Sequence, residues 1–384
     1  MLKTVLVGAG KMGISHLSTL RAHPEVELIG VCDQPGFILD VLGKYTGLPV
    51  FTDYEKMLDS EAPQAVVIAT PTPHHYSMAK AAIVRGISVF CEKPLTLSFT
   101  QSQELATLAA QHQVATQVGY HNRFVGSFQE VHRLLADGAI GKISHAMAES
   151  YGPVVLREKG KTWRSKRSAG GSCLYDYAAH TIDLLHWYLG TPQGVQGSTT
   201  SSIFSSDTDD AVYSNFQMAA QSTAHLSVNW SDESYRKMTT RITLWGQKGR
   251  IVADRQECKV YFNSAAQPPP GYQNGWNVRY TTELTQPVWF YLRGEEYSAE
   301  IAHFIAQSQL AAQGQPVDGL NDFASAGHVD HTIELILADA AGEASRNLPS
   351  ASGQPNAPAV PAKTLSVGRL LQPIRRLLTS VGEK

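Results

Sequence analysis

Three residues in this sequence are of the types that move a proton beside a reacting carbon: Lys93, Asp176 and His180. A neutral histidine can accept the proton of an alcohol, because its pKa lies near neutral pH. A cationic lysine beside the hydroxyl would lower the hydroxyl's pKa and hold the group in place. The three residues therefore predict chemistry in which an alcohol loses a hydride and a proton.

Asp176 and His180 are four residues apart in a segment that reads as a helix, so they share one helical face. The carboxylate can fix the imidazole tautomer or bind a substrate hydroxyl, and Asp183 could orient the imidazole ring. Two alternatives remain open. The pair can simply tie neighbouring elements together, or Cys173, Asp176, His180 and His186 can form a metal site. We predict no metal, because this set matches no standard ligand pattern and hydride transfer to nicotinamide requires none.

The N-terminus predicts where the hydride would go. A β-branched run over Thr4–Gly8 reads as a strand, and a helical stretch over Lys11–Ala22 follows the turn GAGKMG. The G-x-G-x-x-G spacing permits a tight turn, close approach of a pyrophosphate and close packing of the helix. Asp33 follows the second strand, Val26–Cys32, where a carboxylate would accept hydrogen bonds from a ribose diol. The predicted cofactor residues here are Gly8, Gly10, Lys11, Met12, Gly13 and Asp33.

The acidic residue also bears on the choice of cofactor. A carboxylate at Asp33 would repel a 2′-phosphate, so the sequence predicts NAD rather than NADP. The alternative is a plain strand–helix turn in which Asp33 is a surface residue.

Strands and helices continue to alternate through the first third of the chain. Further strands are expected at Ala65–Ala69, Ile87–Cys91 and Ala115–Val118, with helices at Tyr76–Arg85 and Ser98–Gln111. This rhythm predicts a parallel sheet with helices on both faces, and ligands bind beyond the carboxyl ends of such strands. Lys93 follows one of these strand ends, in the step Glu-Lys-Pro, where proline stops the strand. We therefore expect Lys93 near the nicotinamide end of the cofactor.

Bulk composition narrows the class of protein. The chain has 384 residues, which predicts two domains, with 43% apolar and 17% charged residues and a net charge of -2. Basic residues are not in excess, so the composition does not indicate a nucleic-acid partner. The four cysteines are far apart, which predicts reduced thiols and a cytoplasmic protein.

These motifs together resemble the Gfo/Idh/MocA oxidoreductase family. The matching stretches, in order along the chain, are GAGKMG, Asp33, ATPTPHH, CEKP, VGYHNRF and GGSCLYDYAAHTIDLLHW. They cover about the first half of the chain. The resemblance implies an α/β fold, with an N-terminal Rossmann doubly wound parallel sheet (1–122). A C-terminal α+β domain with a large, open, mainly antiparallel sheet would follow (123–347).

The resemblance also implies an activity and further site residues. It implies NAD(P)-dependent oxidation or reduction of a sugar, polyol or sugar derivative, with Lys93, Asp176 and His180 on the family's catalytic positions. Other residues fall on segments that line the cofactor or the substrate: Thr70, Pro71, His75, Glu92, Tyr120, His121, Asn122, Arg123, Trp163 and Arg164. Thr72 departs from the family, which often has asparagine there.

The second half of the chain is expected to build the open sheet. Strand-like segments occur at Ile143–Val155, Val195–Phe204, Ala211–Phe216, Thr223–Asn229, Thr239–Trp245 and Arg250–Asp254. An open sheet needs its second face covered, and the family's sheet usually serves as an oligomer interface. We therefore expect a homodimer or homotetramer.

Two features suggest a particular substrate. The segment 263–296 reads as a loop rich in proline, glycine, aromatics and arginine, and a basic run precedes the Gly-Gly turn: Arg157, Lys159, Lys161, Arg164, Lys166 and Arg167. Bases stack on aromatic rings and phosphates pair with arginine, which favours a nucleotide-linked sugar, such as a UDP-linked one, used in surface glycan synthesis. The alternatives are ordinary surface loops with a free polyol such as an inositol as substrate, or a non-catalytic NAD-binding regulator.

The C-terminal residues 348–384 form a third region. A linker rich in proline, serine and alanine precedes a segment with leucines on one helical face and several arginines. This tail could contact an anionic membrane surface, but docking on the protein itself or on a neighbouring subunit is the favoured interpretation.

Overall fold

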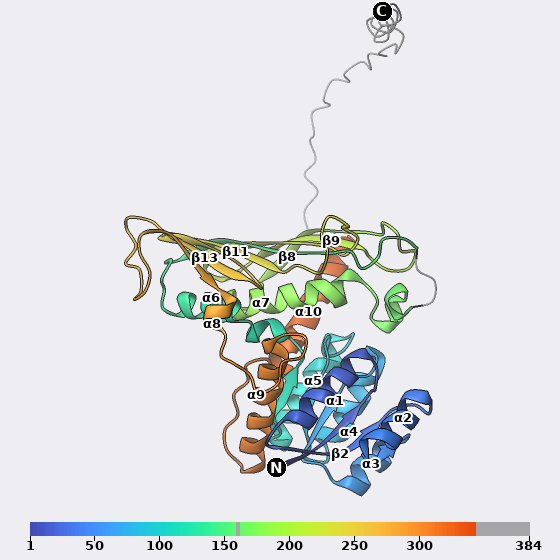
Figure 1. Ribbon diagram of the computed structural model, residues 1–384. Coiled ribbons are helices and arrows are strands. Elements are labelled where there is room, and N and C mark those ends of the chain that lie inside the picture. The colour runs from blue at the N-terminus through green and yellow to red at the C-terminus, as the bar shows by residue number, and fades with distance from the viewer. Residues whose placement is uncertain (159–161, 343–384) are drawn as a thin grey trace, which may run out of the picture. The chain divides into compact units, whose positions relative to one another are not determined.

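The computed structural model describes residues 1–158 and 162–342, and Figure 1 shows their arrangement. The N-terminal part contains a six-stranded parallel sheet in the order β3-β2-β1-β4-β5-β6. Its strands are β1 (Leu2–Val7), β2 (Val26–Cys32), β3 (Val50–Phe51), β4 (Ala65–Ile68), β5 (Ser88–Cys91) and β6 (Thr116–Val118). The order reverses between β1 and β4, which is where such sheets bind their ligands. The predicted parallel sheet is confirmed.

Helices cover both faces of this sheet. Its helices are α1 (Lys11–Ala22), α2 (Phe37–Thr46), α3 (Tyr54–Glu61), α4 (His75–Ile83) and α5 (Phe99–His112). Along β1, Val5 and Val7 belong to one apolar cluster, whereas Leu6 belongs to another. Because successive side chains of a strand point to opposite faces, both faces of β1 are buried in apolar cores. Helices α2 and α3 were not among the predicted elements.

One helix of this layer comes from much later in the chain. Helix α9 (Glu295–Ala312) contributes Ile301, Phe304 and Ile305 to the cluster that contains Leu6. The rings of Phe304 and Phe90, on β5, meet edge to face at 5.8 Å. The predicted division at residue 122 assigns α9 to the second domain, although its apolar side packs on the first sheet.

The second sheet has eight strands in the order β14-β13-β12-β11-β7-β10-β9-β8. The strands are β7 (Ile143–Tyr151), β8 (Gly194–Ser201), β9 (Ala211–Gln217), β10 (Thr223–Asn229), β11 (Arg241–Gly246), β12 (Gly249–Asp254), β13 (Glu257–Phe262) and β14 (Gly275–Tyr280). All neighbouring strands are antiparallel except β7 and β10. The predicted large, mainly antiparallel sheet is confirmed.

Three helices lie along one face of the second sheet: α6 (Gly126–Ala136), α7 (Ala179–Leu189) and α10 (Phe323–Ala340) (Figure 1). Ala146 and Ala148 of β7 are buried on that side, while the residues next to them in the strand are only half-buried. Within the described residues no helix covers the opposite face, which exposes aromatic rings such as Tyr213 and Trp276. Coverage of this face by another subunit stays a prediction.

The predicted loop at 263–296 is partly wrong. It contains strand β14 and the short helix α8 (Thr281–Leu284), and α9 begins near its end. The exposure of alternate residues explains the strand, since Trp276, Val278 and Tyr280 all point to the same outer side. Glycine and proline in the flanking stretch hid this alternation. The predicted linker and tail lie outside the described residues.

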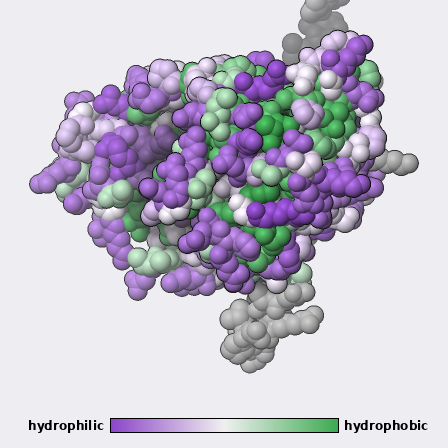
Figure 2. Space-filling view, turned by 90° about the horizontal axis from the view of Figure 1, so that it is seen from below, coloured by the Kyte–Doolittle hydropathy of each residue, from purple (hydrophilic) through white to green (hydrophobic). Residues whose placement is uncertain are grey.

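Hydrophilic side chains cover most of the face shown in Figure 2, with apolar side chains surfacing in patches between them. Among the described residues, no helix is both long enough and apolar enough to cross a membrane. All four cysteines are free and buried, and burial is the first cause that raises the pKa of each thiol. The expectation of unpaired thiols is confirmed.

Candidate active site

The turn between β1 and α1 has the geometry of a phosphate cradle. Gly8 has φ of +93°, and a Cβ there would lie 2.5 Å from the Ala69 carbonyl oxygen. A Cβ on Gly13 would lie 1.8 Å from the Gly8 carbonyl oxygen, whereas one on Gly10 would meet nothing within 4 Å. Gly8 and Gly13 are therefore required by backbone packing, and Gly10 leaves an open approach. Helix α1 begins without a side-chain cap, so its first N–H groups are available to an anion.

Asp33 is held at the same rim by backbone donors. Its Oδ2 accepts from the Ala9 N–H at 2.5 Å and its Oδ1 from the Gln34 N–H at 2.6 Å. The carboxylate is half-buried, and its remaining lone pairs suit two hydroxyls of a ribose. The residues at this rim therefore fit a dinucleotide. Other predicted cofactor residues near the rim are at least partly exposed: Lys11, Met12, Thr70 and Pro71.

Lys93 leaves the end of β5 and reaches a different part of the chain. Its Nζ donates to Asp176 Oδ1 at 2.7 Å and to the Asp176 carbonyl oxygen at 3.0 Å. Neighbouring Glu92 binds His16 Nε2 at 2.7 Å through Oε1. Burial raises the pKa of Glu92, but His16 and Lys93 more than offset this, and the pKa lies below its ordinary value. Glu92 is thus a carboxylate beside the cofactor rim.

The His75 side chain is buried and is not exposed at the cofactor rim. Its ring is 1% exposed, with Nδ1 2.9 Å from the Pro94 carbonyl oxygen and Nε2 2.8 Å from the Thr70 carbonyl oxygen. Direct contact of His75 with the cofactor was predicted, but the ring instead joins the loop after β4 to the loop that carries Lys93.

Asp176 receives two cations. Lys93 binds Oδ1, and Arg164 donates from Nε to Oδ2 at 3.0 Å. Burial raises the pKa of Asp176, but Lys93 and Arg164 outweigh burial and hold the pKa below its usual value. The Arg164 guanidinium also lies over the Trp163 ring, at 4.4 Å from its centroid. Because both carboxylate oxygens are engaged, Asp176 fixes Lys93 rather than the tautomer of His180.

The helix around Asp176 is not a regular α-helix. Residues Leu174–Ala178 form a π-helical turn that leads into α7. The expected one-turn alignment of Asp176 with His180 assumed an α-helix, and the wider turn alters that alignment. π-helical turns are frequent at functional sites.

His180 is 4% exposed and lies near enough to Lys93 for the ammonium charge to act on its ring. Burial first, then the charges of Lys93 and Arg255, hold the pKa of His180 well below its ordinary value. The ring is therefore neutral at neutral pH and able to take a proton. Its Nδ1 is buried and has no hydrogen-bond partner within the described residues, which leaves Nε2 as the nitrogen for a substrate.

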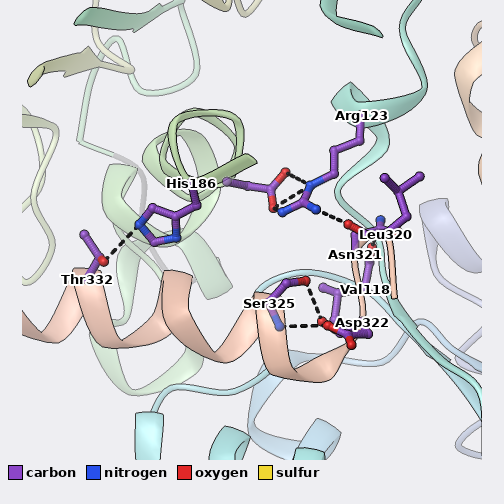
Figure 3. A network of polar contacts seen from close by, with 9 residues as sticks. Val118, Arg123, His186, Leu320, Asn321, Asp322, Ser325 and Thr332 are labelled. Atoms are coloured by element: carbon purple, nitrogen blue, oxygen red, sulfur yellow. Dashed lines mark hydrogen bonds and ion pairs between the residues drawn. The ribbon is translucent and has the colours of Figure 1, made fainter. Parts of the chain in front are cut away.

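Asp183 does not orient His180, contrary to the sequence prediction. Its carboxylate binds Arg123, at 3.1 and 3.0 Å from Nε and at 2.6 Å from Nη2. Figure 3 shows Arg123 pointing toward the Leu320 carbonyl, to which Nη1 also donates. The buried guanidinium lies 5.7 Å from the Trp187 ring centroid. Arg123 thus joins three segments of the chain, and its predicted contact with substrate is replaced by a structural role.

Two neighbours of Arg123 are also buried. Tyr120 and Asn122 are 0% exposed, and their side-chain polar atoms have no hydrogen-bond partner within the described residues. The Tyr120 ring meets the edge of the His180 ring at a centroid distance of 5.9 Å. Tyr120 therefore packs against the proposed base, and substrate contact by either residue stays a prediction.

One wall of the site was predicted only in part, through the stretch from Tyr120 to Arg123. The His121 ring lies 4.7 Å from the His180 ring and stacks on Tyr297 at 4.7 Å. His121 Nε2 accepts from Arg255 Nη1 at 3.1 Å. His121 stands inside the VGYHNRF stretch and could have been singled out there. Arg255, in the turn between β12 and β13, carried no signal.

Comparison with known proteins decides the family. Residues 2–120 match the model described as oxidoreductase family, NAD-binding Rossmann fold, and residues 128–252 match the GFO/IDH/MocA C-terminal domain. The chain belongs to the Gfo/Idh/MocA family. It is an NAD-binding oxidoreductase of this family, as the sequence predicted.

Individual relatives of the family are distant. An uncharacterized oxidoreductase of Synechocystis sp. is 27% identical over 68% of this chain and 73% of its own length. Inositol 2-dehydrogenase of Rhizobium meliloti is 26% identical over 88% of this chain and 94% of its own length. A levoglucosan dehydrogenase structure in complex with NADH has a TM-score of 0.77 at 21% identity, covering 89% of this chain and 97% of that one. This likeness confirms the fold.

The residues predicted to form a nucleotide pocket do not gather at the family site. Trp289 packs against His23, at 4.7 Å between ring centroids, and Trp276 packs against Tyr261 at 5.5 Å. Arg279 donates to the Gly271 carbonyl oxygen. In the basic run, Arg167 pairs with Asp209, and Lys159 and Lys161 lie outside the described residues. Within the described residues, Arg164 joins the site through Asp176, and Arg293 lies beside α1, with its Nη1 3.4 Å from Ser15 Oγ.

Metal binding finds no support at this site. Over residues 1–158 and 162–342, no three His, Cys, Asp or Glu side chains are grouped so as to hold a metal ion. His186, one member of the set considered from the sequence, accepts from or donates to Thr332 Oγ1 at 3.2 Å (Figure 3).

Proposed function

We propose that the protein transfers a hydride between the nicotinamide of NAD and a secondary alcohol or ketone of a sugar derivative. The observation that carries this proposal is the 2.7 Å bond between Lys93 and Asp176, beside neutral His180, at the edge of the first sheet. This rim also carries the open cradle at Gly10 and the ribose acceptor Asp33.

In the proposed reaction, NAD supplies the hydride acceptor when it is bound. His180 accepts the hydroxyl proton at Nε2 as the carbon–hydrogen bond gives up its hydride, so that an alcohol becomes a ketone. Lys93 donates a hydrogen bond to the substrate oxygen and stabilises negative charge that develops there. Asp176 and Arg164 fix the lysine ammonium in position, which lowers the cost of orienting it during the reaction.

Family relatives support a sugar or polyol substrate, including inositol, glucoside and levoglucosan dehydrogenases. The nucleotide-linked sugar of the sequence prediction remains a proposal whose support is the single Trp163–Arg164 step. The inositol alternative is supported by the similarity to inositol 2-dehydrogenase, which spans most of both chains. A non-catalytic regulator is disfavoured because Lys93, Asp176 and His180 are all present and grouped.

Two further proposals concern the setting of the enzyme. Free, buried thiols support a cytoplasmic location. The uncovered face of the second sheet, with its exposed aromatic rings, supports a homodimer or homotetramer.

The proposal is tested by following NADH absorbance with free sugars, inositols, UDP-linked sugars and phosphorylated sugars. Lys93→Met should lower kcat by about a hundredfold to ten-thousandfold while NADH binding stays within about twofold. Lys80→Met is the matched control, because Lys80 also makes a 2.7 Å bond to a carboxylate, Glu104, but at the surface. Wild-type turnover in Lys93→Met, with the fold intact, would contradict the proposed role.

A further inference from the structure

Three cations and three carboxylates surround the site. Lys93 and Arg164 share the single carboxylate of Asp176, and Arg255 pairs with Glu296. Glu92 is engaged by His16 on the cofactor side. Among these cations, the Arg164 and Arg255 side chains are the most exposed, at 38% and 32%, so both can meet a ligand that enters the site.

We infer that the substrate carries an anionic group and that Arg255, braced by His121 and Glu296, binds it. The inference rests on the proposed function and names the class of substrate: a sugar with a carboxylate or a phosphate ester. Arg255 would then be a specificity-determining residue.

The geometry of Arg255 carries the inference. Its Nη1 donates to His121 Nε2 at 3.1 Å, and its Nη2 pairs with the nearly buried carboxylate of Glu296. Thr281 Oγ1 donates to the Arg255 carbonyl oxygen at 2.8 Å and ties down the turn. The side chain is 32% exposed, so it is held at its base and open at its surface. A guanidinium has five N–H donors, and the fork can bind a carboxylate or a phosphate through two of them.

The position of Arg255 relative to the proposed base supports the same conclusion. The His121 ring that it contacts lies 4.7 Å from the His180 ring. After burial, the charges of Lys93 and Arg255 are the causes that lower the pKa of His180. An anion on Arg255 would therefore lie within one sugar ring or so of the reacting oxygen. It would also offset the cationic field around His180.

A different arginine lies beside the cofactor cradle. Arg293 Nη1 lies 3.4 Å from Ser15 Oγ, in the second turn of α1 and close to the Gly10 cradle. The Arg255 side chain bonds to His121 and Glu296, and neither of these residues belongs to α1. Variants of Arg255 should consequently leave the affinity for NADH unchanged.

The test compares neutral and anionic partners in matched pairs. NADH-loaded protein is titrated with glucose, glucuronate and glucose 6-phosphate, and with inositol and inositol 1-phosphate, while NADH fluorescence is followed. The anionic member of a pair should bind at least about tenfold more tightly, which corresponds to about 1.4 kcal/mol. The preference should weaken with added salt. The carboxylate and phosphate arms identify which anion is preferred.

Variants assign that preference to Arg255. Arg255→Gln should reduce the anionic preference to within about twofold, Arg255→Lys should retain part of it, and Glu296→Gln should increase it. Arg133→Gln is the matched control, because Arg133 is also half-exposed and paired with a nearly buried glutamate, Glu130. Arg133→Gln should leave the anionic preference intact. The affinity for NADH should stay unchanged in every variant of the series.

Several outcomes overturn the inference. If the wild-type protein bound the neutral and anionic members of each pair equally, the inference would be overturned. Turnover of the neutral sugars in that case would still support the proposed function. An anionic preference that survives in Arg255→Gln would also overturn the inference. Absence of both binding and turnover across the panel would contradict the proposed function and the inference together.

Discussion

The two sheets contribute to the site by different means. At the rim of the first sheet, the site is built mainly from main-chain atoms: glycines shape the cradle, and backbone N–H groups donate to Asp33. Where the second sheet and its helices meet the loops and helix α9 of the first, side chains from distant segments pair with one another, as in Lys93–Asp176–Arg164 and His121–Arg255–Glu296. Substitutions in the first region should therefore weaken cofactor binding, whereas substitutions in the second should lower the catalytic rate or change the choice of substrate.

The largest expected effect tests the side-chain region. His180→Asn should lower kcat by about a hundredfold to ten-thousandfold at neutral pH, because the proton would lose its acceptor. The affinity for NADH, measured by fluorescence titration, should change little. A variant that lost NADH binding as well would erase the distinction between the two regions.

A pair of glycines sharpens the comparison within the cradle. Gly10→Ala should fold normally, because its Cβ meets nothing within 4 Å, but should weaken NADH binding by about tenfold or more. Gly13→Ala should lower the melting temperature strongly, because its Cβ would overlap the Gly8 carbonyl. Thermal melts in parallel with NADH titration separate the two results. Equal melting temperatures for both variants would show that the turn relaxes.

Asp33 offers a smaller effect on cofactor choice. Asp33→Ser should remove the repulsion toward a 2′-phosphate and shift the ratio of NADH to NADPH affinity by about tenfold toward NADPH. The loss of two backbone hydrogen bonds should also loosen the turn slightly. An unchanged ratio would mean that another group reads the ribose.

The smallest expected effect lies between the regions. Asp330 of α10 accepts from Ser102 Oγ at 2.6 Å and from the Thr96 N–H at 3.3 Å, near the loop that carries Lys93. Burial raises the pKa of Asp330 from 3.8 to about 7. The folded protein therefore holds a proton that the unfolded chain releases, and stability falls as pH rises from about 4 to 7.

Asp330→Asn should remove this penalty. Its melting temperature should exceed that of wild type by roughly 3–6 °C at pH 8, and the difference should vanish near pH 3.5. Differential scanning calorimetry at several pH values measures the difference. A constant difference at all pH values would assign the effect to packing rather than to ionisation.

Much of this organisation could be predicted from the sequence. Strands β1, β4 and β5 are short apolar runs with their catalytic or cofactor residues placed directly after them, so local pattern was enough. The meeting of Lys93 with Asp176 followed from motifs that occur together in the family. Strand β14 was missed because glycine and proline beside it masked a clear alternation.

The remaining failures concern contacts that sequence spacing does not encode. Asp183 is three residues from His180, yet it binds Arg123, 60 positions away. The partner of His121 is Arg255, 134 positions away, on a turn that only the folded sheet brings near. His75 stands in a recognisable motif, but its burial between two carbonyl oxygens depends on how two loops close together. Such pairings require the tertiary structure.

Helix α9 has a consequence for biosynthesis. All six strands of the first sheet lie before residue 120 and leave the ribosome early. Helix α9, which supplies Phe304 and Ile305 to the core of that sheet, leaves it much later. At elongation rates of about 5–20 residues per second, the whole second sheet is translated before α9 can pack against Leu6 and Phe90. During that interval the nascent chain exposes an apolar surface, which is the kind of surface that chaperones bind.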